Sequence, residues 1–254
     1  MSLFNLKNKS FLITGSSKGI GKAIAFHAAS HGAQVIISSR KIDACKETAK
    51  EINDQVGSEL AFPIAGNIAH ESELINLVDE SNKALGKIDV LICNAATNPF
   101  MGSMADIPSD AFDKVMNNNI KANHILTNLV TPQMIERKDG VIIIISSVGG
   151  TKGNNLIGTY NLSKAADIQM VKNIAVGYGH HNIRANSIAP GLIRTDFAKG
   201  LWENPAIHDQ YTSTHPMKRI GEPDEVAGVA IMLASDAGKY INGQTIIVDG
   251  GATA

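Results

Sequence analysis

The chain has 254 residues, of which 44% are hydrophobic, so it is long enough to bury a substantial core. Its formal net charge of -1 provides no basic surface for nucleic acid or for an anionic membrane. The two cysteines, Cys45 and Cys93, are too few for a disulfide framework. Because no apolar run reaches transmembrane length and the first ten residues lack an apolar signal core, we expect a cytoplasmic protein.

Short β-branched runs alternate with longer segments of helical periodicity along the whole chain. The expected strands are 11–14, 34–38, 60–64, 88–93, 141–146, 184–188 and 245–248. The expected helices lie near 20–31, 43–55, 71–84, 110–137, 160–179 and 224–234, and Pro132 should kink or divide the fourth. Runs such as VIIII are apolar without alternation, which indicates a parallel sheet buried on both faces. The pattern predicts one α/β domain over residues 1–254, a Rossmann-type doubly wound sheet of about seven strands with helices on both faces.

The region 192–222 is the one long stretch without clear periodicity. It is rich in polar and large apolar residues. In a compact domain a long irregular segment is more often functional than accidental, so we interpret 192–222 as a substrate lid.

A glycine-rich turn, TGSSKGIG at residues 14–21, follows the first expected strand and opens the first expected helix. Glycines let the backbone approach a pyrophosphate, which a helix N-terminus then stabilises. A plain strand-to-helix turn is the alternative, but the position after the first strand favours a dinucleotide site.

The end of the second expected strand, VIISSRK, discriminates between the two nicotinamide cofactors. An acidic residue there would bind the free ribose hydroxyl of NAD, but no carboxylate occurs before Asp43. Ser39, Arg40 and Lys41 occupy the turn instead, and Lys18 of the glycine loop should lie on the same side. Such groups suit a 2′-phosphate, so we expect NADP(H) in preference to NAD(H). The alternative is that the basic residues only begin the second helix in solvent.

These motifs, with others in a fixed order, resemble those of the short-chain dehydrogenase/reductase family over nearly the whole chain. CNAAT at 93–97 resembles the Asn-Asn-Ala-Gly element of that family, with Cys93 and Ala96 as departures; NNNIKAN, ISSVGG, TYNLSK and APGLIRT follow. NAATNPFMGS, SSRK and APGLIRTDF resemble more narrowly the NADP-dependent carbonyl and retinal reductase branch. Asn67 in AGNIAH stands where many relatives have an aspartate that holds the adenine amino group, and it keeps an acceptor oxygen.

The resemblance implies four catalytic residues, Asn119, Ser147, Tyr160 and Lys164. Tyr160 would be the acid/base, and a tyrosine working near neutral pH needs its pKa lowered by about 3 units, or ~4 kcal/mol. One ammonium at ~5 Å supplies ~3 kcal/mol at an effective dielectric constant of ~20, so Lys164 one helical turn away is nearly sufficient. Ser147, favoured over Ser146 by the spacing of the family, would stabilise the substrate oxygen. Asn119 would hold a water that links Lys164 to solvent. As an isolated helix pair, Tyr160 and Lys164 would otherwise be a half-buried aromatic and a solvated lysine.

The resemblance also implies the cofactor and substrate contacts. The expected cofactor residues are Gly15, Ser17, Lys18, Gly19, Ile20, Gly21, Ser39, Arg40, Asn67, Ile68, Asn94, Ala95, Tyr160, Lys164, Pro190, Gly191, Ile193 and Thr195. The expected substrate residues are Ser147, Phe100, Met101, Phe197 and Trp202. This apolar set favours an apolar ketone or aldehyde, interconverted with a secondary alcohol, over a sugar or a charged acid.

Two other functions remain open. One is a 3-oxoacyl-carrier-protein reductase, for which Arg194, Lys199, Lys218 and Arg219 would face an acidic carrier. The other is a non-catalytic dinucleotide-sensing protein, although such proteins usually lose the tyrosine or the lysine. We expect no metal site, because His27 and His31 have no third ligand in sequence.

A homotetramer with two-fold symmetry is expected, largely from the resemblance. The expected helices 110–137 and 160–179 carry apolar residues beyond one stripe, which suggests a second buried face. These residues are Ile120, Ile125, Leu129, Met134, Ile168, Met170, Val171 and Ile174.

Overall fold

The computed structural model describes residues 2–254, without the side chains of Ile207 and Gln210. Within these residues, seven strands form one sheet in the order β3-β2-β1-β4-β5-β6-β7, and every neighbouring pair is parallel. The strands are β1 Ser10–Thr14, β2 Gln34–Ser38, β3 Ala61–Pro63, β4 Val90–Cys93, β5 Gly140–Ile145, β6 Ile183–Pro190 and β7 Thr245–Val248. The expected parallel, doubly wound sheet is therefore confirmed.

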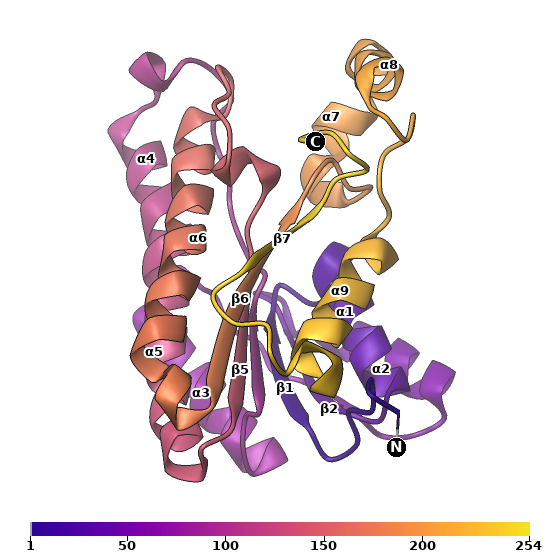
Figure 1. The fold of residues 1–254 in the computed structure, drawn as a ribbon, viewed down its shortest axis with the longest axis vertical. Helices are drawn as coiled ribbons and strands as arrows, with labels where there is room; N and C mark the ends of the chain where they lie inside the picture. The colour runs from indigo at the N-terminus through magenta and orange to yellow at the C-terminus, as the bar shows by residue number, and fades with distance from the viewer. Residues whose placement is uncertain (1) are drawn as a thin grey trace.

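Helices cover both faces of this sheet (Figure 1). One face carries α1 Gly19–Ser30, α2 Ile42–Val56 and α9 Pro223–Ala234. The other carries α3 Glu71–Leu85, α4 Ser109–Met116, α5 Ala122–Arg137 and α6 Gly158–Tyr178. Two short helices, α7 Lys199–Trp202 and α8 Pro205–Thr214, lie beyond the carboxyl edge of the sheet, beside the C-terminus (Figure 1).

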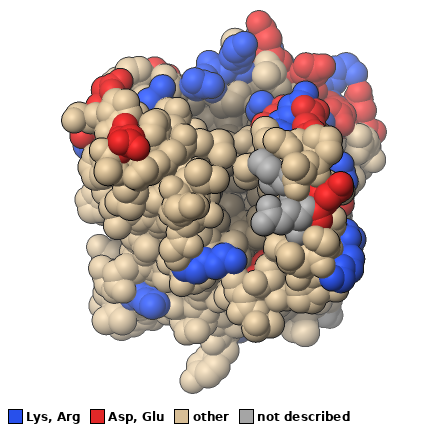
Figure 2. All heavy atoms as spheres, turned by 90° about the horizontal axis from the view of Figure 1, so that it is seen from above, with Lys and Arg blue, Asp and Glu red and all other residues tan. Residues whose placement is uncertain are grey.

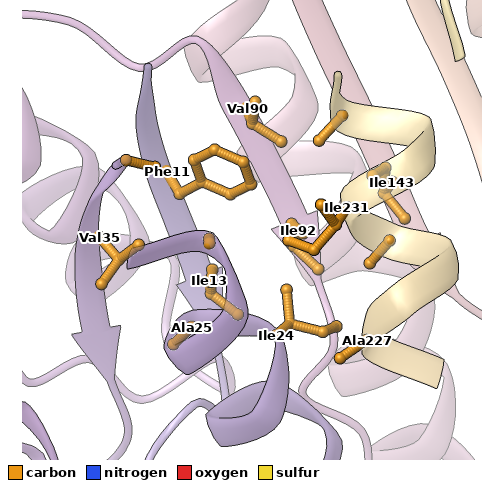
Figure 3. Close-up of a cluster of buried hydrophobic side chains, with 14 of the residues drawn as sticks. Phe11, Ile13, Ile24, Ala25, Val35, Val90, Ile92, Ile143, Ala227 and Ile231 are labelled. Carbon is orange, nitrogen blue, oxygen red and sulfur yellow. The ribbon is translucent and has the colours of Figure 1, made fainter. Parts of the chain in front are cut away.

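The sheet is buried on both faces, which explains the uninterrupted apolar runs in its sequence. On β1, Phe11 and Ile13 pack with α1 and α9, as Figure 3 shows, whereas Leu12 between them packs with the helices of the opposite face. Successive strand residues point to opposite faces, so a strand with helices on both sides needs an apolar side chain at each position.

The fourth expected helix differs from the prediction in where it is interrupted. Pro132 lies inside α5, which continues past it to Arg137. Proline has no backbone N–H to donate to the Asn128 carbonyl. Because Pro132 and Asn128 are both exposed, water can hydrogen-bond this carbonyl instead. The division occurs instead at Asn117–Lys121, a π-helical turn between α4 and α5. π-Helical turns of this kind occur frequently at functional sites.

The apolar residues expected to form a second helix face are largely used within the monomer. Met134, Val171 and Ile174 belong to the buried core, and the other five are half-buried. Because α5 and α6 also contact neighbouring helices, much of this surplus apolar surface is already covered within the monomer, and a second face buried between copies stays a prediction. The apolar side chains that α6 does expose are Leu162 and Val176, the latter 85% exposed.

The strand order places the loops of interest at one point. Chain order reverses between β1 and β4, and in open parallel sheets ligands bind outside the carboxyl ends of strands at such a reversal. The loops after β1, β4, β5 and β6 all leave this edge. No helix among the described residues combines the length and the hydropathy needed to cross a membrane.

Candidate active site

The glycine loop forms a closely packed turn between β1 and α1. Gly15 and Gly19 have φ angles of 65° and 57°, a left-handed conformation that costs glycine nothing. A Cβ on Gly21 would lie 2.6 Å from both Asn94 Nδ2 and the Gly15 carbonyl oxygen. No larger residue fits there, and such glycines let the backbone at the start of α1 approach a pyrophosphate closely.

Asn94 and Thr14 fix this loop against the end of β4. The Asn94 amide donates to the carbonyls of Thr14 and Gly15 at 2.9 and 3.1 Å. The Thr14 hydroxyl accepts from the backbone N–H groups of Asn94 and Ala95 at 3.0 and 3.1 Å. The structure thus brings the expected cofactor residues Gly15, Asn94 and Ala95 into contact, and Thr14 is a supporting residue that the sequence analysis missed.

Ser17 and Ile20 lie in the same turn. The Ser17 carbonyl accepts from the Thr48 hydroxyl at 3.0 Å, which ties the loop to α2. Ile20 is half-buried and packs against the hydrophobic core.

The basic residues expected at a 2′-phosphate are exposed, but they are not equally free. Lys18 Nζ forms an ion pair with Asp196 Oδ2 at 2.9 Å, which links the glycine loop to residues 192–222. The Ser39 hydroxyl lies within hydrogen-bond distance of the Lys41 carbonyl and of Cys45 Sγ. Arg40 makes no hydrogen bond or ion pair with the part of the chain that the structure describes, so its guanidinium is available to an anion.

Asn67 and Ile68, the expected adenine contacts, follow β3 in a half-buried turn. The acceptor oxygen of Asn67 is bonded to the Ala69 backbone N–H at 3.2 Å, and the Asn67 N–H donates to Glu73 at 2.8 Å. This turn is therefore held by local contacts of Asn67 with Ala69 and Glu73.

The segment after β6 lies over the glycine loop. A Cβ on Gly19 would lie 3.2 Å from Thr195 Cγ2, so Thr195 covers the start of α1. Leu192 and Ile193 are secured beneath it: the Tyr211 hydroxyl accepts from the Leu192 N–H at 3.1 Å, and Ile193 bridges to Gly221. Pro190 and Gly191 connect this segment to β6.

The two serines after β5 have different surroundings. Ser146 is buried, and its hydroxyl donates to the Lys164 carbonyl at 2.8 Å, joining β5 to α6. Ser147 is half-buried; its hydroxyl accepts from the Gly149 N–H at 3.0 Å and is hydrogen-bonded to the Tyr160 side chain. The structure therefore places Ser147, rather than Ser146, beside Tyr160.

Lys164 lies one helical turn after Tyr160 on α6 and is itself buried, with 2% of its side chain exposed. Its ammonium is 5.6 Å from the centre of the Tyr160 ring. It donates to the Ile145 carbonyl at 2.8 Å and to Asp167 Oδ2 at 2.9 Å. The expected catalytic residues Ser147, Tyr160 and Lys164 are thus brought together at the carboxyl end of β5.

Burial, two charges and a hydrogen bond act on Tyr160. Burial raises the pKa of its hydroxyl, the Lys164 ammonium lowers that pKa, and the Asp167 carboxylate raises it. The hydrogen bond with Ser147 lowers the pKa further. The sequence analysis counted only cationic groups that stabilise the phenolate, and it omitted burial and Asp167, which both oppose ionisation of Tyr160.

Asn119 lies in the π-helical turn, close to these residues but with its side chain engaged. Its amide accepts from the Thr97 N–H at 2.8 Å and donates to the Thr97 carbonyl and to the Ser163 hydroxyl, both at 3.0 Å. Asn119 thereby joins the loop after β4 to α6. Its own backbone carbonyl accepts from Asn123 Nδ2 at 2.7 Å.

The mouth of the site is apolar. The Phe197 ring centre lies 6.0 Å from that of Tyr160, and Phe100, Met104 and Leu156 line a depression that Tyr160 also borders. Seen from above, this end of the molecule is largely uncharged and hollowed between its two sides (Figure 2).

Of the expected substrate residues, Phe100 and Phe197 are therefore near Tyr160. Met101 is 54% exposed. Trp202 donates from its indole nitrogen to the Thr195 carbonyl at 2.9 Å, so it supports the segment after β6.

Comparison with known proteins agrees with this geometry. The family model described as enoyl-(acyl carrier protein) reductase matches residues 15–253. Dehydrogenase/reductase SDR family member 4 of Bos taurus is 40% identical over 253 residues, which cover 97% of this chain and 88% of that protein. The chain belongs to the short-chain dehydrogenase/reductase family. It is accordingly an oxidoreductase of the class that acts on CH–OH donors with a nicotinamide cofactor.

Solved short-chain dehydrogenases/reductases share the fold but differ in cofactor and ligand. A 7α-hydroxysteroid dehydrogenase in complex with NADH and 7-oxo glycochenodeoxycholic acid is 36% identical, with a TM-score of 0.93 over 98% of this chain and 96% of that chain. A gluconate 5-dehydrogenase from Burkholderia cenocepacia in complex with NADP and tartrate is 31% identical, with a TM-score of 0.93 over 99% of this chain and 97% of that chain. Family membership therefore fixes the reaction class and leaves the choice of cofactor to this chain's own residues.

Proposed function

We propose that this protein is an NADP(H)-dependent carbonyl reductase that interconverts an apolar ketone or aldehyde with its alcohol. The observation that carries the proposal is the convergence of Ser147, Tyr160 and Lys164 under an apolar mouth, at the edge of the sheet from which the glycine loop also leaves. The similarity to proteins named dehydrogenase/reductase SDR family member 4 is consistent with the carbonyl and retinal reductase branch.

In the proposed mechanism of reduction, Tyr160 donates its hydroxyl proton to the carbonyl oxygen of the substrate. The hydroxyl of Ser147 donates a hydrogen bond to the same oxygen and stabilises the charge that develops on it. The resulting phenolate lies beside the Lys164 ammonium, which lowers the cost of leaving Tyr160 ionised. Gly15, Gly19 and Gly21 would provide the backbone surface for the pyrophosphate of the cofactor, whose nicotinamide would supply the hydride when bound.

The preference for NADP(H) is supported by Arg40. Its exposed guanidinium at the end of β2 is the group best suited to a 2′-phosphate, because it can bond two phosphate oxygens at once. Lys18 adds to this only if its ion pair with Asp196 opens. Asp196→Asn would remove that competition, so we expect it to tighten NADPH binding several-fold and to leave NADH binding unchanged.

The region 192–222 is proposed to act as the substrate lid. It carries Phe197 toward Tyr160 and contains α7 and α8, which the absence of periodicity in the sequence did not predict. Ion pairs hold it to the body of the protein on two sides, through Lys18–Asp196 and Arg219–Glu225.

The alternative of a 3-oxoacyl-carrier-protein reductase is less well supported. Arg194 and Arg219 are paired with Glu222 and Glu225, and Lys199 lies 3.4 Å from Glu203. Their charges are therefore largely matched and offer little attraction to an acidic carrier. A purely sensing protein is disfavoured because Tyr160 and Lys164 are both retained.

A homotetramer and a cytoplasmic location complete the proposal. Leu162 and Val176 of α6 support a two-fold contact along this helix, and Ile247 of β7, 45% exposed, supports a second. Light scattering tests the assembly, and a fully active monomer would contradict it.

The deciding experiment is a reduction assay of the purified protein with NADPH and with NADH. Substrates should span apolar ketones, aldehydes, retinal, gluconate-like acids and a 3-oxoacyl thioester, and Tyr160→Phe serves as the matched inactive control. We expect NADPH-dependent turnover of the apolar carbonyls. Faster turnover with NADH would contradict the cofactor proposal, and preference for the thioester would favour the alternative function.

A further inference from the structure

A buried carboxylate lies directly beside the lysine of the site. Asp167 follows Lys164 by one helical turn on α6 and has no exposed surface. Its Oδ2 accepts from Lys164 Nζ at 2.9 Å, and its Oδ1 accepts from Asn123 Nδ2 at 3.0 Å. An ion withdrawn from water in this way is costly unless its partners are well placed, and both oxygens here have one.

Asn123 holds this carboxylate from a different helix. It lies near the start of α5, and the same amide nitrogen also donates to the Asn119 carbonyl at 2.7 Å. A chain of hydrogen bonds thus runs from Lys164 through Asp167 and Asn123 to Asn119 in the π-helical turn. The Ile145 carbonyl on β5 accepts a hydrogen bond from a second N–H of the ammonium, which leaves one of its three N–H groups for other partners.

The titratable groups around Asp167 come from two elements. Tyr160 and Lys164 lie on α6, and Cys93 ends β4. Burial raises the pKa of the Cys93 thiol well above its ordinary value, so this thiol stays neutral. Burial also raises the pKa of Asp167, and the contacts with Lys164 and Asn123 oppose that rise. The Asp167 charge raises the pKa values of both Tyr160 and Lys164.

We propose that Asp167 is a positioning residue: it anchors the Lys164 ammonium to α5 through Asn123, and its negative charge sets the pH range over which Tyr160 works. The proposal rests on the function proposed above. Lys164 is then one half of a buried ion pair, and the other half, Asp167, moderates its effect on Tyr160.

Removal of this charge has a definite sign. Asp167→Asn keeps the size of the side chain and removes one negative charge, which favours loss of a proton from any neighbouring group. The apparent pKa of the Tyr160–Lys164 pair should fall by about one unit, whichever of the two groups loses the proton. Asn123→Ala keeps the charge and removes its anchor, so it should lower kcat several-fold and leave this pKa nearly unchanged.

Two readouts test the proposal, one of which does not need turnover. For carbonyl reduction, kcat/KM declines as rising pH ionises Tyr160, and in Asp167→Asn this decline should occur about one pH unit lower than in the wild type. The phenolate absorbance of the protein without cofactor, after subtraction of the Tyr160→Phe titration, should shift by the same amount. If the proposed reaction fails altogether, this optical titration still decides the role of Asp167.

An unchanged midpoint in both readouts would overturn the proposal. If Asp167→Asn does not fold, the carboxyl carbon resonance of Asp167 in the wild type gives the answer. An ionised Asp167 throughout the titration of Tyr160 supports the proposal, and a neutral one contradicts it. Unchanged kcat in a folded Asn123→Ala protein would contradict the anchoring through α5.

Discussion

Replacement of each serine after β5 by alanine should separate a structural hydroxyl from a catalytic one. Ser146 is 3% exposed and donates to the Lys164 carbonyl at 2.8 Å, so Ser146→Ala loses one buried hydrogen bond, worth about 0.5–1.5 kcal/mol. In a chain of this length that corresponds to a loss of roughly 1–6 °C in Tm. Ser147→Ala loses the hydroxyl hydrogen-bonded to Tyr160, and removal of an oxyanion donor lowers kcat by about 10²–10³-fold.

The assay is steady-state reduction of an apolar ketone with NADPH, alongside thermal unfolding of both variants. We expect Ser146→Ala to be less stable and to keep most of its kcat. Ser147→Ala should also lose some stability, because its hydroxyl accepts from the Gly149 N–H, and it should lose most of its kcat. If the two variants lost kcat equally, or if Ser146→Ala lost more, the assignment of Ser147 from its contacts would be refuted.

Three further substitutions address the cofactor site and the acid stability. Arg40→Asp should shift the ratio of kcat/KM values toward NADH by at least ~10-fold, through the lost phosphate contacts, and an unchanged ratio would count against Arg40. Gly21→Ala would put a methyl group 2.6 Å from Asn94 Nδ2, so we expect weaker binding of both NADPH and NADH in fluorescence titrations; wild-type affinities would show that the loop adapts. Contact with Arg219 lowers the pKa of Glu225 from 4.5 to about 2. The ionised carboxylate therefore stabilises the folded protein fully above pH 4.5, the pKa in the unfolded chain, and this stabilisation is lost as the pH falls through about 2. In urea unfolding at neutral pH, Glu225→Gln should be less stable than the wild type by about 1 kcal/mol or less, because the ion pair is exposed. At about pH 2 the two proteins should unfold alike, and equal stability at neutral pH would exclude a stabilising role for this ion pair.

Much of the fold could be predicted because strand and helix periodicity are local properties. The apolar run from Val141 to Ile145 indicated a strand buried on both faces, and it is β5. The order of the motifs likewise predicted that Ser147, Tyr160 and Lys164 would meet. Pro132 was misleading, because a proline on the exposed side of a helix need not end it.

Pairings between helices could not be predicted in the same way. Asn123 and Asp167 are 44 residues apart, and their contact depends on how α5 packs against α6. A signal was nevertheless present, since Asp167 is an acidic residue one turn after Lys164 in a largely uncharged helix. The Lys18–Asp196 ion pair joins the glycine loop to the region 192–222. Neither the sequence around Lys18 nor that around Asp196 indicated this contact.

The central claim, that Tyr160 is the proton donor of a carbonyl reductase, is tested most directly by Tyr160→Phe. The substitution removes one hydroxyl and keeps the ring that packs near Phe197, so folding and NADPH affinity should be nearly unchanged. We predict that kcat for reduction of an apolar carbonyl falls by ~10²-fold or more in a variant that still binds NADPH. Retention of more than about a tenth of wild-type kcat would contradict the account.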